Sequence, residues 1–201
     1  LIEKGLTPPL LLVAEGIVKA LEYAHSKGAV HGNLRPNNIL VGEDIKLSDF
    51  GLRLLEENAS LSDAALMIER SRYQAPEQIA GQSIDSRTDM FALGVILYQL
   101  STGQSPYHNN DFEQPPLPPR QLNTQLSRSF EHLLLKLLAI DPDERYESAA
   151  QIRQVLANLN PDSAVIHQEF AETEPISRAV IADPSMSTAP ELIPQRRGRL
   201  I

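Results

Sequence analysis

The sequence predicts a mainly α-helical fold of the α+β class, in which a bundle of helices carries one small β-hairpin. Apolar residues recur three and four positions apart in several segments, which is the spacing of one helix face. Two short apolar runs flank a turn at residues 42–44, as in a hairpin. With 42% hydrophobic residues, the 201-residue chain can form one domain core and a tail.

The first predicted helix covers residues 7–27. Thr7 can cap its first turn, where the two following prolines are tolerated, and Gly28 ends it. We expect His25, near its end, to be a packing residue. The apolar face of this helix is formed by Leu10, Val13, Ile17, Leu21 and Ala24.

A second helix is predicted at residues 86–102 and is apolar on nearly every side, which indicates either a protein core or a membrane. Its apolar run, from Met90 to Leu100, is much shorter than the roughly 20 residues of a membrane span, so we assign it to the core. Residues 127–139 and a final segment are amphipathic. Their apolar faces are Phe130, Leu133, Leu134, Leu137 and Leu138, then Ile152, Val155, Leu156 and Leu159.

The predicted hairpin, which pairs residues 38–41 with residues 45–47, should bring Asn38 and Asp49 together at its open end. Asn38 enters the first strand and Asp49 follows the second, so an amide oxygen and a carboxylate should lie close together. Hard oxygen ligands of this kind suit Mg²⁺, which takes water and phosphate oxygens as its remaining ligands. We therefore expect Asn38 and Asp49 to be the ligands of any bound magnesium.

The order and spacing of several motifs resemble the eukaryotic-type protein kinase family, in its bacterial-like Ser/Thr form. The family pattern contains H-R-D-L-x-x-x-x-N, then D-F-G and A-P-E. The resemblance covers residues 1–159 and implies the C-terminal lobe only, without the N-terminal lobe, so we expect a fragment of a longer chain. The matching motifs are His31-Gly32-Asn33 with Asn38, Asp49-Phe50-Gly51, Ala75-Pro76-Glu77, Asp89, and Asp141-Pro142 with Arg145.

The resemblance places three altered residues in the catalytic loop. Asn33 stands where the family has its catalytic Asp, Gly32 replaces the preceding Arg, and Arg35 replaces a Lys near the transferred phosphate. An amide cannot take a proton near neutral pH, and base catalysis is worth about 10²–10⁴-fold. Arg35 keeps the positive charge but changes its geometry. This degenerate H-G-N loop is typical of a pseudokinase.

The resemblance also implies where nucleotide and packing residues lie. Leu40 takes the position of the apolar floor beneath adenine, beside the metal ligands Asn38 and Asp49. Mg-ATP is expected for the full-length parent and not as a tight ligand of this fragment, since half of the phosphate-handling apparatus belongs to the N-terminal lobe. In the family, the Asp at position 89 bonds the loop backbone. Structural roles are implied for His31, Phe50, Gly51, Glu77, Asp89 and Arg145.

Two of these residues, Glu77 and Arg145, are expected to form a buried ion pair, whose loss of one partner costs about 3–5 kcal/mol. Residues 52–72 match the activation segment, but Glu69 and Arg70 stand where an active Ser/Thr kinase usually has Gly-Thr. In the family, a phosphate on this segment normally pairs with the Arg that precedes the catalytic Asp. Gly32 stands at that position and has no side chain to pair, so we do not expect regulation by phosphorylation through this route.

After residue 107 the family usually has another helix, which must be short or missing here because a proline run, 115–119, follows closely. This run contains P-x-x-P and can serve either as a polyproline II ligand for an SH3-like partner or as a rigid connector. We favour the connector.

Composition limits the partners. The formal net charge of −8 argues against nucleic acid, and the absence of cysteine fits a reducing cytosol. Residues 160–201 have prolines but no sustained period, which predicts a disordered tail or a juxtamembrane linker. Because their end is basic, a membrane segment beyond Ile201 stays open, with the domain on the cytoplasmic side. Otherwise we expect a cytoplasmic protein.

Two functions remain open. The first is a pseudokinase that binds nucleotide or a protein partner and regulates signalling without transferring phosphate. The second is a Ser/Thr protein kinase with weak or atypical catalysis, represented by a truncated chain that acts on a protein substrate. A plain helical interaction domain is disfavoured by the ordered motifs. The altered catalytic loop favours the pseudokinase, although whether the parent is an enzyme stays open.

Overall fold

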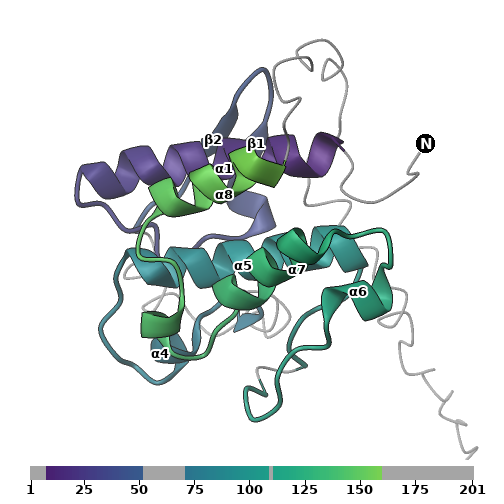
Figure 1. Ribbon diagram of the computed structural model, residues 1–201. Helices are drawn as coiled ribbons and strands as arrows, with labels where there is room; N and C mark the ends of the chain where they lie inside the picture. Colours follow the sequence, from purple (N-terminus) through teal and green to yellow (C-terminus); the bar gives the residue numbers. More distant parts are fainter. Residues whose placement is uncertain (1–7, 52–70, 109–110, 160–201) are drawn as a thin grey trace, which may run out of the picture.

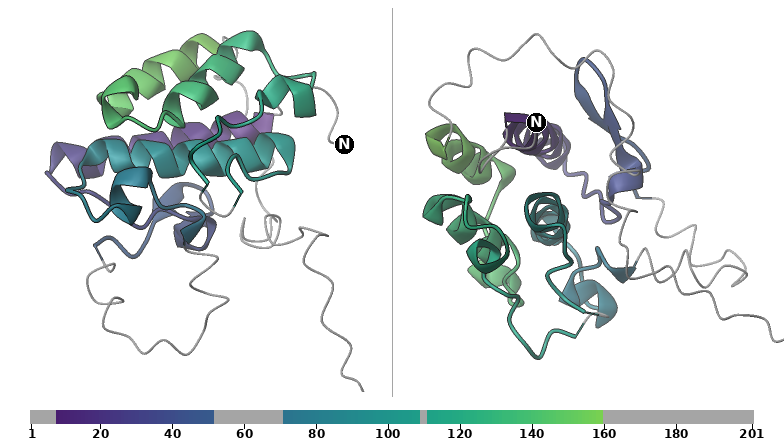
Figure 2. Two further views of the ribbon diagram at one scale, coloured as in Figure 1. Left: turned by 90° about the horizontal axis from the view of Figure 1, so that it is seen from below. Right: turned by 90° about the vertical axis from the view of Figure 1, so that its right-hand side faces the viewer.

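The computed structural model describes residues 8–51, 71–108 and 111–159 (Figure 1). Its helices are α1 (Pro8–Ser26), α4 (Pro76–Ile79), α5 (Ser86–Thr102), α6 (Pro119–Leu122), α7 (Arg128–Leu137) and α8 (Ala149–Leu159), and its strands are β1 (Ile39–Val41) and β2 (Ile45–Leu47). Helix α1 packs against α5, α8 and β2, and α5 packs in turn against α6 and α7 (Figure 2). This arrangement confirms the predicted helical bundle with one small hairpin.

Helix α5 forms the centre of the core, because its side chains are buried on nearly every side. The carboxylate of Asp85 accepts a hydrogen bond from the Arg87 backbone N–H at 2.8 Å and so caps the helix start. At Gly94 the helix approaches α7 closely: a Cβ there would lie 2.8 Å from the Leu137 Cβ. The sequence interpretation of this segment as core, and not as a membrane span, agrees with this burial.

The other helix ends differ little from those predicted. Helix α1 ends at Ser26 and α7 begins at Arg128, where the Ser127 hydroxyl accepts from the Phe130 N–H at 3.1 Å. Thr7, the expected first cap, lies outside the described residues, as do the predicted tail 160–201 and most of the segment 52–72. None of the described helices is long and apolar enough to cross a bilayer.

The proline run is attached to the core and leads into α6, a four-residue helix that the sequence pattern did not predict. The Tyr98 hydroxyl donates to the Leu117 carbonyl at 2.8 Å, and Pro119 is buried. These contacts favour the rigid-connector interpretation. Between Gly103 and Pro118, leaving aside the undescribed 109–110, the chain has no helix, as the close spacing of the proline run led us to expect.

The hairpin positions the candidate site. Strands β1 and β2 are antiparallel, with Ile39 opposite Leu47 and Val41 opposite Ile45. One step beyond this register, the Ser48 backbone N–H donates to the Asn38 carbonyl at 3.0 Å. The pairing therefore holds Asn38 level with Ser48, next to Asp49, at the open end of the hairpin.

Candidate functional site

One buried carboxylate binds the backbone of residues 31–38, which we call the catalytic-like loop. Asp89, in the first turn of α5, is 1% exposed. Its Oδ2 accepts from the His31 backbone N–H at 2.9 Å, and its Oδ1 accepts from the Gly32 N–H at 2.8 Å. Two successive peptide groups of the loop are thus hydrogen-bonded to the central helix, which fixes the path of the loop backbone at His31 and Gly32.

A third donor reaches the same carboxylate, from α1. The His25 Nε2 lies 2.8 Å from Asp89 Oδ2, whereas its Nδ1 is buried without a hydrogen-bond partner among the described residues. His25 is therefore more than the packing residue that we expected. Local sequence patterns carry no signal for this contact, because the two residues are 64 positions apart.

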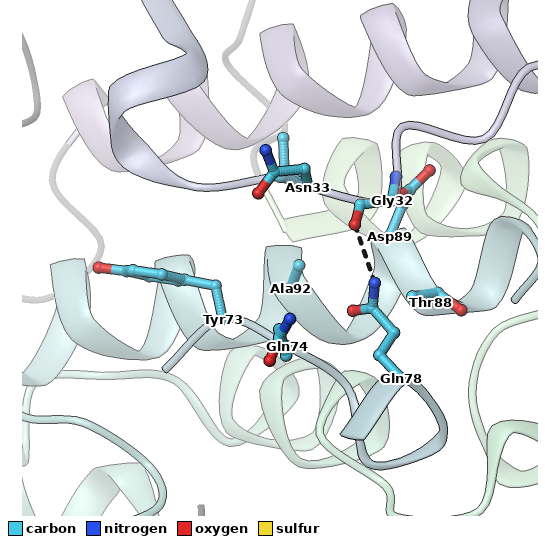
Figure 3. A pocket seen from close by; sticks show the side chains of 9 residues that line it. Gly32, Asn33, Tyr73, Gln74, Gln78, Thr88, Asp89 and Ala92 are labelled. Atoms are coloured by element: carbon cyan, nitrogen blue, oxygen red, sulfur yellow. Dashed lines mark hydrogen bonds between the residues drawn. The ribbon is translucent and has the colours of Figure 1, made fainter. Parts of the chain in front are cut away.

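Gly32 adopts a backbone conformation that favours glycine. Its φ is +68°, and a Cβ there would lie 3.2 Å from the Ile84 Cδ1. Its carbonyl accepts a hydrogen bond from the Gln78 Nε2 at 2.8 Å (Figure 3). Glycine adopts positive φ without the steric cost that other L-residues incur. Glycine at position 32 thus allows this backbone conformation without steric strain.

His31 lies under the loop as a neutral ring. Its centroid is 4.4 Å from that of Phe50, and its backbone carbonyl accepts from the Gly51 N–H at 3.2 Å. The Nδ1 accepts from the Asn33 N–H at 3.3 Å, which requires an unprotonated nitrogen. Burial lowers the pKa of His31 and outweighs the nearby carboxylates, of which Asp89 acts most strongly. The structure thus brings together His31, Phe50 and Gly51.

Asn33 lines a small pocket between the loop and α4 (Figure 3). The cavity has a volume of about 10 Å³, which is room for about one water molecule. The Asn33 side-chain Nδ2 is buried and, in the described part of the chain, has no hydrogen-bond partner. Gln78 and Tyr73 line the opposite wall. The Asn33 side chain is therefore an amide that cannot accept a proton near neutral pH, and its Nδ2 completes no hydrogen bond with the described residues.

The two expected metal ligands lie at the open end of the hairpin. Asn38 donates through Nδ2 to the Asn33 carbonyl at 2.8 Å, which leaves its Oδ1 as the atom able to bind a cation. Asp49 is exposed, has a φ of +61° and accepts from the Ser48 hydroxyl at 2.9 Å. No group of three or more His, Cys, Asp or Glu able to hold a metal occurs among the described residues. One amide and one carboxylate fit Mg²⁺ whose other ligands are water and phosphate.

Two apolar residues close to these ligands in the sequence are exposed to solvent. Leu40 is 54% exposed and Phe50 is 37% exposed. Arg35 precedes the short 3₁₀ turn Pro36–Asn38 and is half-buried. Glu69 and Arg70, the two altered positions of the segment before Tyr73, lie outside the described residues. Of the expected nucleotide residues, Leu40 and Asp49 are thus exposed, whereas Asn38 is only 2% exposed.

On the other side of α4, the expected ion pair is present and fully buried. Arg145 donates to both carboxylate oxygens of Glu77, each at 2.8 Å, and the Thr88 hydroxyl donates to Oε1 at 2.9 Å. Burial alone would raise the pKa of Glu77, but the hydrogen bonds from Arg145, a backbone N–H and Thr88, together with the charge of Arg145, outweigh burial and lower the pKa. The remaining Arg145 N–H groups donate to the carbonyls of Arg87, Ala139 and Ile140. Every guanidinium donor therefore has an acceptor.

Comparison with known proteins agrees with this geometry. The family model for the protein kinase domain matches residues 10–157. A probable serine/threonine-protein kinase of Clostridium perfringens is 32% identical over 86% of this chain and 27% of its own length. The serine/threonine-protein kinase Pkn1 of Myxococcus xanthus is 32% identical over 94% of this chain and 29% of its own length.

A solved structure shows the same fold. The Mycobacterium tuberculosis PknI kinase domain superposes with a TM-score of 0.60 at 27% identity, and the match covers 78% of this chain and 58% of that one. The chain spans less than a third of the length of the two curated relatives.

Proposed function

This chain belongs to the protein kinase family, in its bacterial Ser/Thr branch, and we propose that it is the C-terminal lobe of a pseudokinase. In this proposal the parent protein binds nucleotide or a protein partner and regulates signalling without efficient phosphoryl transfer. The observation that carries the proposal is Asn33. Its amide occupies the position of the family's base and cannot accept the proton of a substrate hydroxyl.

The binding side of the site supports retention of a ligand. Asn38 Oδ1 and the Asp49 carboxylate would hold Mg²⁺, and Leu40 would contact the adenine. A magnesium ion held by these two residues would supply positive charge to neutralise the phosphates of the nucleotide. The N-terminal lobe of the parent would complete the nucleotide site, so Mg-ATP is proposed for the parent and not for residues 1–159 alone.

A Ser/Thr protein kinase with weak catalysis is the second candidate, because the metal ligands persist and the relatives are named as kinases. Arg35 keeps a positive charge in the loop, and phosphoryl transfer relies largely on positioning and charge. Such an enzyme would act on a protein substrate, with a rate lowered by the missing base, about 10²–10⁴-fold. The two candidates thus differ only in transfer.

We further propose the domain boundary and the location. Residues 1–159 form the kinase-like lobe, and residues 160–201 form a proline-containing tail or a linker to a membrane segment beyond Ile201. The domain would lie in the cytoplasm in either case. Protein partners are proposed, and nucleic acid is not, because the chain carries a net charge of −8.

The test uses the full-length parent. We expect Mg-ATP to raise its melting temperature, since a ligand that binds only the folded state stabilises it. Asp49→Ala should abolish that shift, whereas Asp44→Ala, an exposed acid in the hairpin turn, should not. Transfer of labelled phosphate should be absent from the native protein. Clear transfer that Asp49→Ala removes would overturn the pseudokinase proposal in favour of the enzyme. If no nucleotide binds, only a partner-binding scaffold remains.

A further inference from the structure

We propose that Gln78 is a positioning residue that couples the catalytic-like loop to the Ala75–Glu77 segment through a neutral hydrogen-bond bridge. The bridge would hold the backbone of the catalytic-like loop in one conformation without any phosphate on the activation segment. Its regulatory meaning rests on the proposed function, because a binding lobe with a permanently set loop needs no phosphorylation switch. The bridge itself rests on contacts alone.

Both ends of the Gln78 amide are used, and the side chain is 5% exposed. Its Nε2 donates to the Gly32 carbonyl at 2.8 Å, and its Oε1 accepts from the Ala75 backbone N–H at 3.0 Å. The first contact joins residues 46 positions apart. An amide side chain presents both a donor and an acceptor without carrying charge, whereas an ionised carboxylate only accepts.

The bridge completes a clamp on one residue, Gly32, because it holds the second of the two peptide groups that flank it. The Gly32 N–H donates to Asp89 from one side, and its carbonyl accepts from Gln78 on the other. Gly32 has an unusual φ of +68°, so without both contacts the backbone there has many alternatives. Asn33 is the next residue, and the direction of its side chain follows from the orientation of the peptide group between Gly32 and Asn33.

The bridge starts from a rigid base. Glu77, the residue before Gln78, is held by Arg145 through two hydrogen bonds. Since α4 is thereby fixed to the core, Gln78 transmits the position of the Ala75–Glu77 segment to the loop. The family's charged route is unavailable, because Gly32 has no side chain to pair with a phosphate. The neutral route through Gln78 is the alternative connection.

The test measures amide hydrogen exchange by NMR on the 201-residue chain, which needs no nucleotide. At pH 7.5, Gln78→Glu should lower the protection of the His31 and Gly32 amides by about tenfold or more, because a carboxylate cannot donate to the Gly32 carbonyl. At pH 5.0 a buried Glu, whose pKa burial raises, is protonated and regains both a donor and an acceptor. Protection should then recover.

Two controls isolate the bridge. Gln78→Met fills similar space without polar atoms, so protection should fall at both pH values. Because Gln78→Met adds no titratable group, any change in its protection between the two pH values reports the other ionisable residues that face this region. These residues are His25, His31, Glu77 and Asp89. Gln74→Glu places the same new carboxyl in the same pocket, but should leave loop protection unchanged at both pH values.

Unchanged loop protection in both Gln78 variants, or a Gln78→Glu variant that behaves like Gln78→Met at pH 5.0, would overturn the proposal. If Gln78→Glu fails to fold at pH 7.5, recovery of its folding on acidification, without recovery for Gln78→Met, gives the same answer. A failure of nucleotide binding in the parent leaves this result unaffected, so the two proposals can fail separately.

Discussion

Two sides of the catalytic-like loop differ in the hydrogen bonds that their polar groups make. The inner side faces the core and includes Asp89 and the Glu77–Arg145 pair, and the outer side includes Asn33 and Leu40. On the inner side, Asp89 accepts three hydrogen bonds, and Arg145 uses all its donors. On the outer side, the Asn33 Nδ2 is buried without a partner in the residues that the structure describes, and so is the Nδ1 of His25 on the inner side. Leu40, on the outer side, is 54% exposed.

This difference separates residues that specify the fold from residues that the family uses for chemistry. A buried charge without partners is costly, so the inner contacts constrain their residue types strongly. The outer positions make few internal contacts, and a substitution such as that at Asn33 removes none that the fold needs. If Asn33 occupies the base position, as we propose, the lobe can keep its fold without the base. Substitutions on the two sides should differ accordingly.

The largest effect is expected from Arg145→Met, which strands the Glu77 carboxylate in the core. We expect a loss of about 3–5 kcal/mol in the free energy of unfolding, measured by urea denaturation. Arg153→Met is the matched control: Arg153 pairs with Glu22 at 2.7 Å, but its side chain is 55% exposed. That pair should contribute less than about 1 kcal/mol. Equal losses in the two variants would contradict the assignment of the inner pair to the fold.

The same pair predicts a pH dependence. Because the folded-state pKa of Glu77 is lowered from its ordinary 4.5, its contribution is present above pH 4.5 and lost as the pH falls through the folded value. In Arg145→Met the unpaired Glu77 is easier to protonate. The stability difference between wild type and variant should therefore shrink on acidification, first above pH 4.5 as Glu77 of the variant takes up a proton, and then below pH 4.5 as Glu77 of the wild type does. A difference that stays constant from pH 7 to pH 3 would show that the pair is not the cause.

The next largest effect is expected from Asp89→Asn. An amide has one acceptor oxygen and presents an N–H₂ group to donors that are already facing it, so at least one charge-assisted hydrogen bond is lost. We expect a loss of about 2–3 kcal/mol in the free energy of unfolding. Asp85→Asn is the control, since Asn also caps helices well, and should cost less than about 1 kcal/mol. If the two variants are equally stable, the loop does not depend on Asp89.

Sequence reasoning reaches the elements of this lobe better than its long-range contacts. The all-round apolar pattern of α5 and the spacing in α1 are local, so periodicity is sufficient to predict both helices. The contacts of His25 and Gln78 link positions 64 and 46 residues apart, and depend on rotamers that no local pattern encodes. Helix α6 has four residues, too few for a period.

Gly32→Ala tests whether the fold depends on glycine at position 32 as it depends on the inner residues. The φ of +68° should cost an L-residue about 1–2 kcal/mol, and the new Cβ would lie 3.2 Å from Ile84. Gly42→Ala is the control, because its φ is not positive and its Cβ would have no contact closer than 3.8 Å. Unfolding free energies should separate the two variants by about 1 kcal/mol or more. Gly32→Arg should behave like Gly32→Ala if backbone conformation dominates.

The smallest effect is expected from Asn33→Asp, the reverse of the substitution at Asp89. The two side chains have nearly the same shape, and the Asn33 Nδ2 donates to no partner in the described structure, so its replacement by oxygen removes no hydrogen bond. Asn33 is half-buried, which leaves a carboxylate partly hydrated beside Asp89. We expect a change below about 1 kcal/mol in urea denaturation, within the range of substitutions away from constrained sites. A loss as large as that of Asp89→Asn would place Asn33 among the residues that hold the fold, and its divergence from the family would then have a structural cause and not a catalytic one.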